Sequence, residues 1–145
     1  MNKYREIVNT GETEYNIVGE IGDEIRIKFR KKEPLTEGEI VILCLRELED
    51  DVNNDGFLGF LLNMYAKKFF PKYFADTLNA LKVIGATQTY EKFQEIYERY
   101  SDMQEYDLER LEKDSEYLHT LDRWFYQYND NLTELQYQYI LKHLI

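Results

Sequence analysis

Residues 51–63 read Asp-Val-Asn-Asn-Asp-Gly-Phe-Leu-Gly-Phe-Leu-Leu-Asn and predict two helices joined by a tight turn. Residues 53–56 are Asn53, Asn54, Asp55 and Gly56, and each of these residue types favours turns or left-handed backbone. Residues 57–65, which follow, are mostly apolar. We expect this turn to reverse the chain, with Asn side chains bonding local backbone and Gly56 in a conformation costly for other residues. Phe57 would then anchor the second helix in the core, and Asn63 would end the motif.

A capping box predicts where the helix before this turn begins. Pro34 precedes Thr36-Glu37-Gly38-Glu39, in which the Thr36 oxygen and the Glu39 carboxylate can satisfy the first free amides of a helix. Apolar side chains then recur at helical spacing from Ile40 to Leu48. A largely buried helix is therefore expected over residues 35–51.

The first thirty residues fit two structures. Ile17, Ile21, Ile25 and Phe29 are four apart, as in a helix, but Ile25, Ile27 and Phe29 also alternate, as in a strand. Gly22-Asp23 could be the turn of a hairpin. Helix is favoured, because a lone hairpin would need a sheet that the rest of the chain does not offer.

The remaining chain predicts four more helices. Pro71 suits the first turn of one that Gly85 closes, and Thr87 or Thr89 can cap the next. Their apolar stripes are Phe74, Leu78 and Leu81, and Phe93, Ile96, Tyr97 and Tyr100.

The longest helix is predicted over residues 102–128, where Ser101 and Gln104 form a capping box before a periodic apolar pattern. A last helix follows Thr133, with the stripe Leu132, Leu135, Tyr139 and Leu144. With only two prolines and seven glycines, we expect one all-α domain over residues 1–145, a bundle of about six to seven helices.

Charge and composition exclude several classes of function. The chain has 28 Asp and Glu against 18 Lys and Arg, a formal charge of −10, so nucleic acid and anionic membranes are not expected partners. Cys44 is the one cysteine, so no disulfide framework is expected, and a reducing, cytoplasmic setting fits. No apolar stretch approaches the roughly 20 residues of a membrane helix.

The acidic residues are spaced like the faces of helices. Glu105, Glu109, Glu112 and Glu116 form one stripe on the predicted longest helix, and Glu91, Glu95, Glu98 and Asp102 repeat the spacing before it. A second acidic cluster puts five acids and no base into nine residues: Glu47, Glu49, Asp50, Asp51 and Asp55. Like charges one turn apart oppose helix stability by roughly 0.2 to 0.5 kcal/mol per pair, which favours a binding role, although a solvated helix face is an equally good interpretation.

Enzymatic and metal signals are weak. Asp51-x-Asn53-x-Asp55-Gly56 matches the opening of a calcium loop, but Gly59 and Leu62 occupy the ninth and twelfth positions, where further ligands are required. His119 and His143 have no partner at metal-ligand spacing. We therefore expect no catalytic residues, no cofactor and no metal.

Residues 51–63, Ile84-Gly85-Ala86 and Asp122-Arg123-Trp124-Phe125-Tyr126 resemble a bacterial helical domain of unknown function with Asn-Asn-Gly-Gly-Phe and Ile-Gly-Ala motifs. The resemblance covers residues 34–139, with Asp55 where the family has its first Gly. The best-known relative is an acidic DNA-mimic protein that binds a helix-turn-helix transcription regulator, so the resemblance implies an all-helical fold, a DNA-binding protein as partner and a homodimer. The shared motifs themselves look structural.

The leading hypothesis is a non-enzymatic acidic protein whose carboxylates occupy the positions of phosphates on a basic, DNA-binding partner. The stripe from Glu105 to Glu116 would supply the main contacts and the cluster from Glu47 to Asp55 a second patch. The alternative is an immunity or inhibitor protein that neutralises a basic toxin or nuclease by the same electrostatics. A calcium-binding protein is the third hypothesis.

Overall fold

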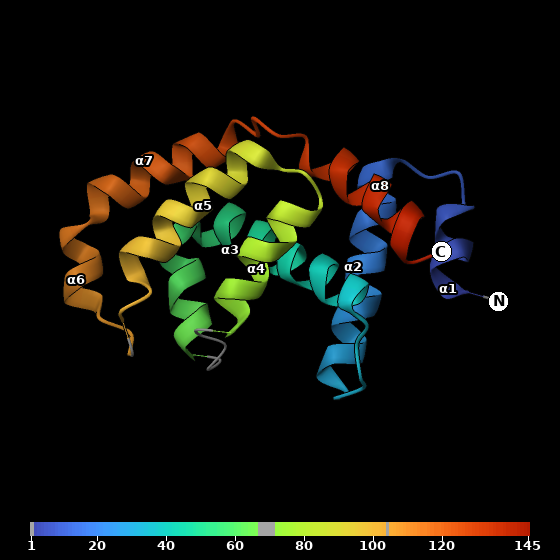
Figure 1. Cartoon of the computed structure of the whole chain (residues 1–145), viewed down its shortest axis with the longest axis horizontal. Helices are drawn as coiled ribbons and strands as arrows, with labels where there is room; N and C mark the ends of the chain where they lie inside the picture. Colours follow the sequence, from blue (N-terminus) through green and yellow to red (C-terminus); the bar gives the residue numbers. More distant parts are fainter. Residues whose placement is uncertain (1, 67–71, 104) are drawn as a thin grey trace.

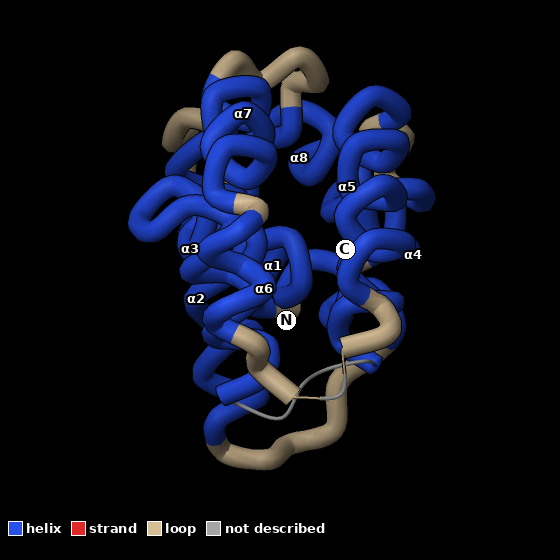
Figure 2. The backbone as a smooth tube through the Cα atoms, turned by 90° about the vertical axis from the view of Figure 1, so that its left-hand side faces the viewer, coloured by secondary structure: helices blue, strands red, loops and turns tan. Residues whose placement is uncertain are grey.

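The computed structural model describes residues 2–66, 72–103 and 105–145, which form eight helices and no strand (Figures 1 and 2). This confirms the predicted all-α class. The helices are α1 (Lys3–Val8), α2 (Glu14–Arg30), α3 (Glu37–Ala66), α4 (Lys72–Val83), α5 (Thr87–Tyr100), α6 (Leu108–Lys113), α7 (Ser115–Tyr126) and α8 (Leu132–His143). None of the described helices is long and apolar enough to cross a membrane.

The first thirty residues are helical, so the favoured interpretation is confirmed. Ile17, Ile21 and Ile25 are buried on one face of α2, whereas Ile27, which a strand would have turned inward beside them, is 44% exposed. The side chain of Thr13 accepts a hydrogen bond from the Asn16 N–H and caps the helix. The period of four therefore decides the structure, and the alternation of residues 25, 27 and 29 is incidental.

Helix α3 runs between two hydrophobic cores (Figure 1). One face, which includes Leu45 and Leu48, packs in the larger core with α4, α5 and α7. Ile42 and Leu43 pack in the smaller core with α2 and α8. Both chain ends lie on the side of the smaller core (Figure 1), where the Asn2 amide donates to the Leu144 carbonyl at 2.9 Å.

The predicted capping box at the start of α3 is confirmed. The Glu39 N–H donates to the Thr36 hydroxyl at 3.1 Å, and the Thr36 N–H donates to the Glu39 carboxylate at 3.0 Å. Glu39 is buried and also accepts from Lys28 at 2.8 Å and from the Tyr4 hydroxyl. Burial alone would raise the pKa of Glu39, but these donors together hold it below its ordinary value. The cap thus also binds α1 and α2 to α3.

The predicted chain reversal at residues 53–56 is wrong. Asn53, Asn54 and Asp55 are helical, and the departure from helical geometry inside α3 is confined to Gly56, with φ 70° and ψ −174°. That backbone region is essentially restricted to glycine, so the predicted costly conformation at Gly56 is confirmed. The structure therefore has a one-residue kink where a turn of several residues was expected, and the two halves of α3 follow each other without a loop (Figure 1).

The predicted long helix over residues 102–128 is also wrong, because Asp114 separates α6 from α7 and helix α6 starts only at Leu108. The Asp107 side chain caps α6 by accepting from the Arg110 N–H at 3.0 Å. The Asp114 side chain is held by α5, through the Arg99 guanidinium at 3.1 Å and the Tyr100 hydroxyl at 2.8 Å. Ser101 ends α5, and Gln104, its expected capping partner, lies outside the described residues.

Two of the other predicted helix starts need correction. Neither Thr87 nor Thr89 caps α5; instead the Asp130 carboxylate accepts from the N–H and hydroxyl of Thr89, at 2.7 and 2.8 Å. Helix α8 is capped by Asn131, which accepts from the Glu134 N–H, so it starts before Thr133. The stripe of α4 and its closure at Gly85, with φ 83°, are as predicted, whereas Pro71 lies outside the described residues.

Candidate partner-binding surface

The kink in α3 is held by a carboxylate from α7. The Phe57 N–H, the first amide after the kink, donates to Asp122 Oδ1 at 2.8 Å. A Cβ atom added to Gly56 would lie 2.5 Å from Asp122 Oδ2, so the close approach of this carboxylate requires glycine. Asp122 therefore caps the second half of α3 from another helix. Burial raises its pKa above the ordinary value, and the bond from Phe57 opposes that rise.

Three aromatic residues near the end of α7 complete this contact. The Phe57 and Phe125 rings meet edge to face at 5.7 Å. The Tyr126 hydroxyl donates to the Val52 carbonyl at 3.0 Å, and the Asn53 amide donates to the Tyr128 hydroxyl at 2.8 Å. We call this set the α3–α7 joint; its members are Val52, Asn53, Gly56, Phe57, Asp122, Phe125, Tyr126 and Tyr128.

The Asn side chains do not bond the local backbone as expected. Asn53 reaches Tyr128, 75 residues along the chain, and Asn63 donates to Asp51 Oδ1 at 3.0 Å. Asn54 is exposed. At Gly59, an added Cβ atom would lie 2.2 Å from the Asp55 Cβ, because the kink brings the two halves of the helix together. The motif of residues 51–63 is thus a bent helix that α7 and its own side chains hold.

Four acids of the cluster from Glu47 to Asp55 have partners within the chain. Arg26 donates to Glu47 at 2.8 Å and to Asp50 at 2.7 Å. Asp51 accepts from Asn63, as described above. Glu49 is largely buried and accepts from the Gln136 amide at 3.0 Å; burial raises its pKa, which this bond opposes. Asp55 is the exposed member of the cluster.

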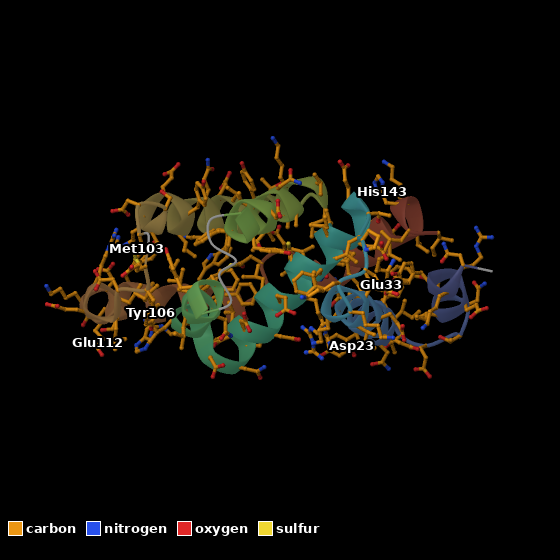
Figure 3. The ribbon with its side chains drawn as sticks, turned by 90° about the horizontal axis from the view of Figure 1, so that it is seen from below. Asp23, Glu33, Met103, Tyr106, Glu112 and His143 are labelled. Atoms are coloured by element: carbon orange, nitrogen blue, oxygen red, sulfur yellow. The ribbon has the colours of Figure 1, made fainter. Side chains whose placement is uncertain are left out.

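The stripe predicted on one helix lies on three segments. Glu105 precedes α6, Glu109 and Glu112 are on α6, and Glu116 is in the first turn of α7. All four side chains are exposed. Figure 3 shows Glu112 at the end of the molecule formed by α6, away from Glu33. The structure therefore keeps these carboxylates at one end of the molecule, without the straight alignment that the sequence suggested.

The neighbouring helix carries a second row of carboxylates. The buried side of α5 contains Thr89, Phe93, Ile96 and Tyr100. At about 100° per residue, Glu91, Glu95 and Glu98 fall on the opposite side, and all three are exposed. We call these three residues, with Glu105, Glu109, Glu112 and Glu116, the acidic surface.

The four cations of residues 91–122 are already engaged. Arg99 pairs with Asp114 at 3.1 Å, Arg110 with Asp102 at 3.0 Å and Lys113 with Glu109 at 3.5 Å. The fourth, Lys92, is 3.9 Å from Glu95 and lies over the Trp124 ring.

These pairs have two consequences. The bonds from Arg99 and from Arg110 lower the pKa values of Asp114 and Asp102 respectively, so both acids stay ionised at neutral pH. Among the described residues, five glutamates of the acidic surface have no ion pair: Glu91, Glu98, Glu105, Glu112 and Glu116.

Nothing in the described ranges resembles a metal centre. Residues 51–55, the opening of the calcium-like motif, are helical instead of looped. In residues 2–66, 72–103 and 105–145, no group of three or more His, Cys, Asp or Glu side chains could hold a metal ion. His119 and His143 are both exposed.

The fold and this surface define an acidic, all-helical protein that presents carboxylates to solvent and pairs the four cations of residues 91–122 within the chain. Residues 33–143 match the DMP19-like protein family, and the chain belongs to that family. Membership implies a DNA-mimic-like protein rather than an enzyme. The predicted resemblance, placed at residues 34–139, is confirmed. No curated protein and no solved structure matches the chain.

Proposed function

We propose that this protein is a DNA mimic whose acidic surface binds a basic, DNA-binding protein, such as a transcription regulator, where that protein would otherwise hold DNA. The observation that carries the proposal is the combination of exposed glutamates on α5, α6 and α7 with internally paired cations on α5 and α6. A partner rich in Lys and Arg would therefore meet carboxylates with few cations of this chain between them. Family membership supports the same role.

The spacing of the carboxylates suits such a partner. Residues three or four apart on a helix have Cβ atoms about 5 to 6 Å apart, which is comparable with the spacing of phosphates along a nucleic-acid backbone. Glu91, Glu95 and Glu98 have this spacing on α5, and Glu109 and Glu112 have it on α6. The pairs Arg99–Asp114 and Arg110–Asp102 link α5 and the residues that follow it to α6 and its end, so the two rows belong to neighbouring segments.

The second acidic patch has a smaller part in this proposal. Glu47, Glu49, Asp50 and Asp51 all have hydrogen-bond partners within the chain, and binding elsewhere would require those bonds to break. Of the five acids in this cluster only Asp55 is exposed, and it lies beside the α3–α7 joint. We therefore assign the principal contacts to Glu105, Glu109, Glu112 and Glu116, supported by the row on α5; of these four only Glu109 has an ion pair, a solvent-exposed one with Lys113 at 3.5 Å that a partner can replace.

Capture from a lysate of the host cells, followed by competition with DNA, tests the proposal. The immobilised protein should retain a DNA-binding protein at low salt and release it as ionic strength rises from roughly 0.1 to 1 M, where the Debye length falls from about 10 to 3 Å. Added duplex DNA that carries the partner's site should displace it. Capture of a nuclease or toxin instead would support the inhibitor hypothesis.

A pair of charge-matched variants then tests the assignment of residues. Replacing Glu105, Glu109, Glu112 and Glu116 by Gln should lower the association rate and flatten its salt dependence. Replacing Glu12, Glu14, Glu20 and Glu33 by Gln makes the same change in net charge with exposed residues in or next to the α2 region, and should affect binding much less. Equal losses in both variants, or no loss in the first, would contradict the assignment.

A further inference from the structure

A cavity of about 180 Å³ lies between α2, α3 and α4, away from the acidic surface. Its walls are mainly apolar, with Phe29 of α2, Leu43, Cys44 and Met64 of α3, and Tyr73 of α4. Leu43, Cys44 and Met64 are themselves buried. The proposed function uses no part of this space.

The cavity opens into a wider hollow of about 550 Å³. Phe29, Arg30, Leu43 and Tyr73 line both spaces, so the two form one groove with a narrower inner part and a wider mouth. The rings of Phe29 and Tyr73 are 5.9 Å apart, edge to face, where the two spaces meet. The residues that line only the mouth are Lys32, Glu33, Leu35 and Ile40.

Cations predominate at this mouth, in a chain whose net charge is −10. Residues 26–32 contain five bases and no acid. Arg26 is engaged by Glu47 and Asp50, but Arg30 and Lys32 make no ion pair with any residue that the structure describes. Basic residues at a helix C-terminus suit the helix dipole. The dipole explains why bases are found there, but it does not explain an open apolar groove beside them.

We propose that this groove binds a small anionic amphiphile, with its apolar group in the inner cavity and its carboxylate at Arg30 and Lys32. The inner volume is comparable with an engineered cavity of about 150 Å³ that binds benzene, so an aromatic ring or a short alkyl chain fits. Arg26 and Glu47 line the inner part, but they pair with each other, whereas Arg30 also lines the mouth, where Lys32 lies beside it. The ligand therefore enters with its apolar end first and leaves its carboxylate at the mouth.

Decanoate, used below its micellar concentration, is the test probe; the end of its alkyl chain would occupy the inner cavity and its remaining methylenes the wider mouth. Titration followed by the amide NMR signals of Phe29, Leu43 and Tyr73 should show saturable binding at one site. Decyltrimethylammonium, which has the same alkyl chain and the opposite charge, should shift these signals far less. Equal shifts with both probes, or none with decanoate, would overturn the proposal.

Two variants locate the ends of the ligand. Arg30→Gln with Lys32→Gln should weaken decanoate binding by about tenfold. The control, Lys31→Gln with Lys142→Gln, removes the same charge from residues that line neither space and should leave the affinity unchanged. Cys44→Leu places a larger side chain against the inner cavity and should weaken binding. Its melting temperature is measured beside that of the native protein, because added volume in a buried position can also destabilise the fold. If the control weakens binding as much as the rim variant, the assigned site is wrong.

Discussion

Replacing Gly56 by Ala should be among the most damaging single-methyl additions to this protein. The backbone at Gly56 lies in a region that costs other residues about 1 to 3 kcal/mol. The new Cβ would also lie 2.5 Å from Asp122 Oδ2, so the carboxylate must move away from the Phe57 N–H. Losing that charge-assisted bond adds about 1.5 to 3 kcal/mol. We expect a total of about 2.5 to 6 kcal/mol, and a melting temperature lower by on the order of 10 °C.

A double-mutant cycle, followed by urea unfolding, measures how much of the lost free energy of unfolding comes from the displaced Asp122 carboxylate. In an Asp122→Ala background the Gly56→Ala substitution should cost only the backbone strain, so the two costs should not add. Gly85→Ala is the matched control, because Gly85 also has a positive φ, of 83°, but nothing lies within 4 Å of its added Cβ. If the costs of Gly56→Ala and Asp122→Ala add to within about 0.5 kcal/mol, the joint does not work as described.

Three further predictions concern the core, a buried carboxylate and calcium. Phe57→Ala should cost roughly 3 to 5 kcal/mol in chemical denaturation, because the ring is buried against Phe125; a cost below 1 kcal/mol would contradict this. Burial raises the pKa of Glu49, so the folded protein holds the proton on this carboxyl group more tightly than the unfolded chain does. As the pH rises through the pKa of Glu49 in the folded protein, the group ionises and the free energy of unfolding falls. Glu49→Gln should therefore raise the melting temperature more at pH 7.5 than at pH 4, and an equal change at both would refute the argument. Calorimetry with millimolar calcium should give no isotherm; a 1:1 isotherm abolished by Asp51→Ala would overturn the helical assignment of residues 51–55.

The elements that could be predicted from the sequence are those decided by neighbours in the chain. The capping box of Thr36 and Glu39 joins residues three apart, and the stripe of α4 follows from its own period. Helix α2 also follows from its period, once the alternative of a hairpin is excluded for want of a sheet. In each case the local pattern and the tertiary contacts favour the same structure.

The predictions that proved wrong concern contacts between residues far apart in sequence. Asp114 interrupts the apolar period because Arg99 and Tyr100 of the preceding helix hold its side chain. Asp130 replaces Thr89 as a cap from 41 residues away. Asp107, three residues before Arg110, and the pair Asp114-Ser115 are typical capping residues and could have indicated the break. The exposure of the glutamates could be predicted, but their distribution over three segments depends on that break.

The residues of the α3–α7 joint, which stabilise the fold, are different from the residues of the acidic surface, which we propose to contact a partner. The members of the joint use backbone groups, buried rings and one inward carboxylate, and none of the glutamates of the acidic surface takes part in it. Outward glutamates can therefore be lost, gained or moved by a turn without disturbing the scaffold. Two proteins that both contain this joint can have the same fold and bind different partners, because their surface charges can differ while the joint stays the same. In such proteins the pattern of surface charge should determine which partner is bound, whereas the residues of the joint should identify members of the family.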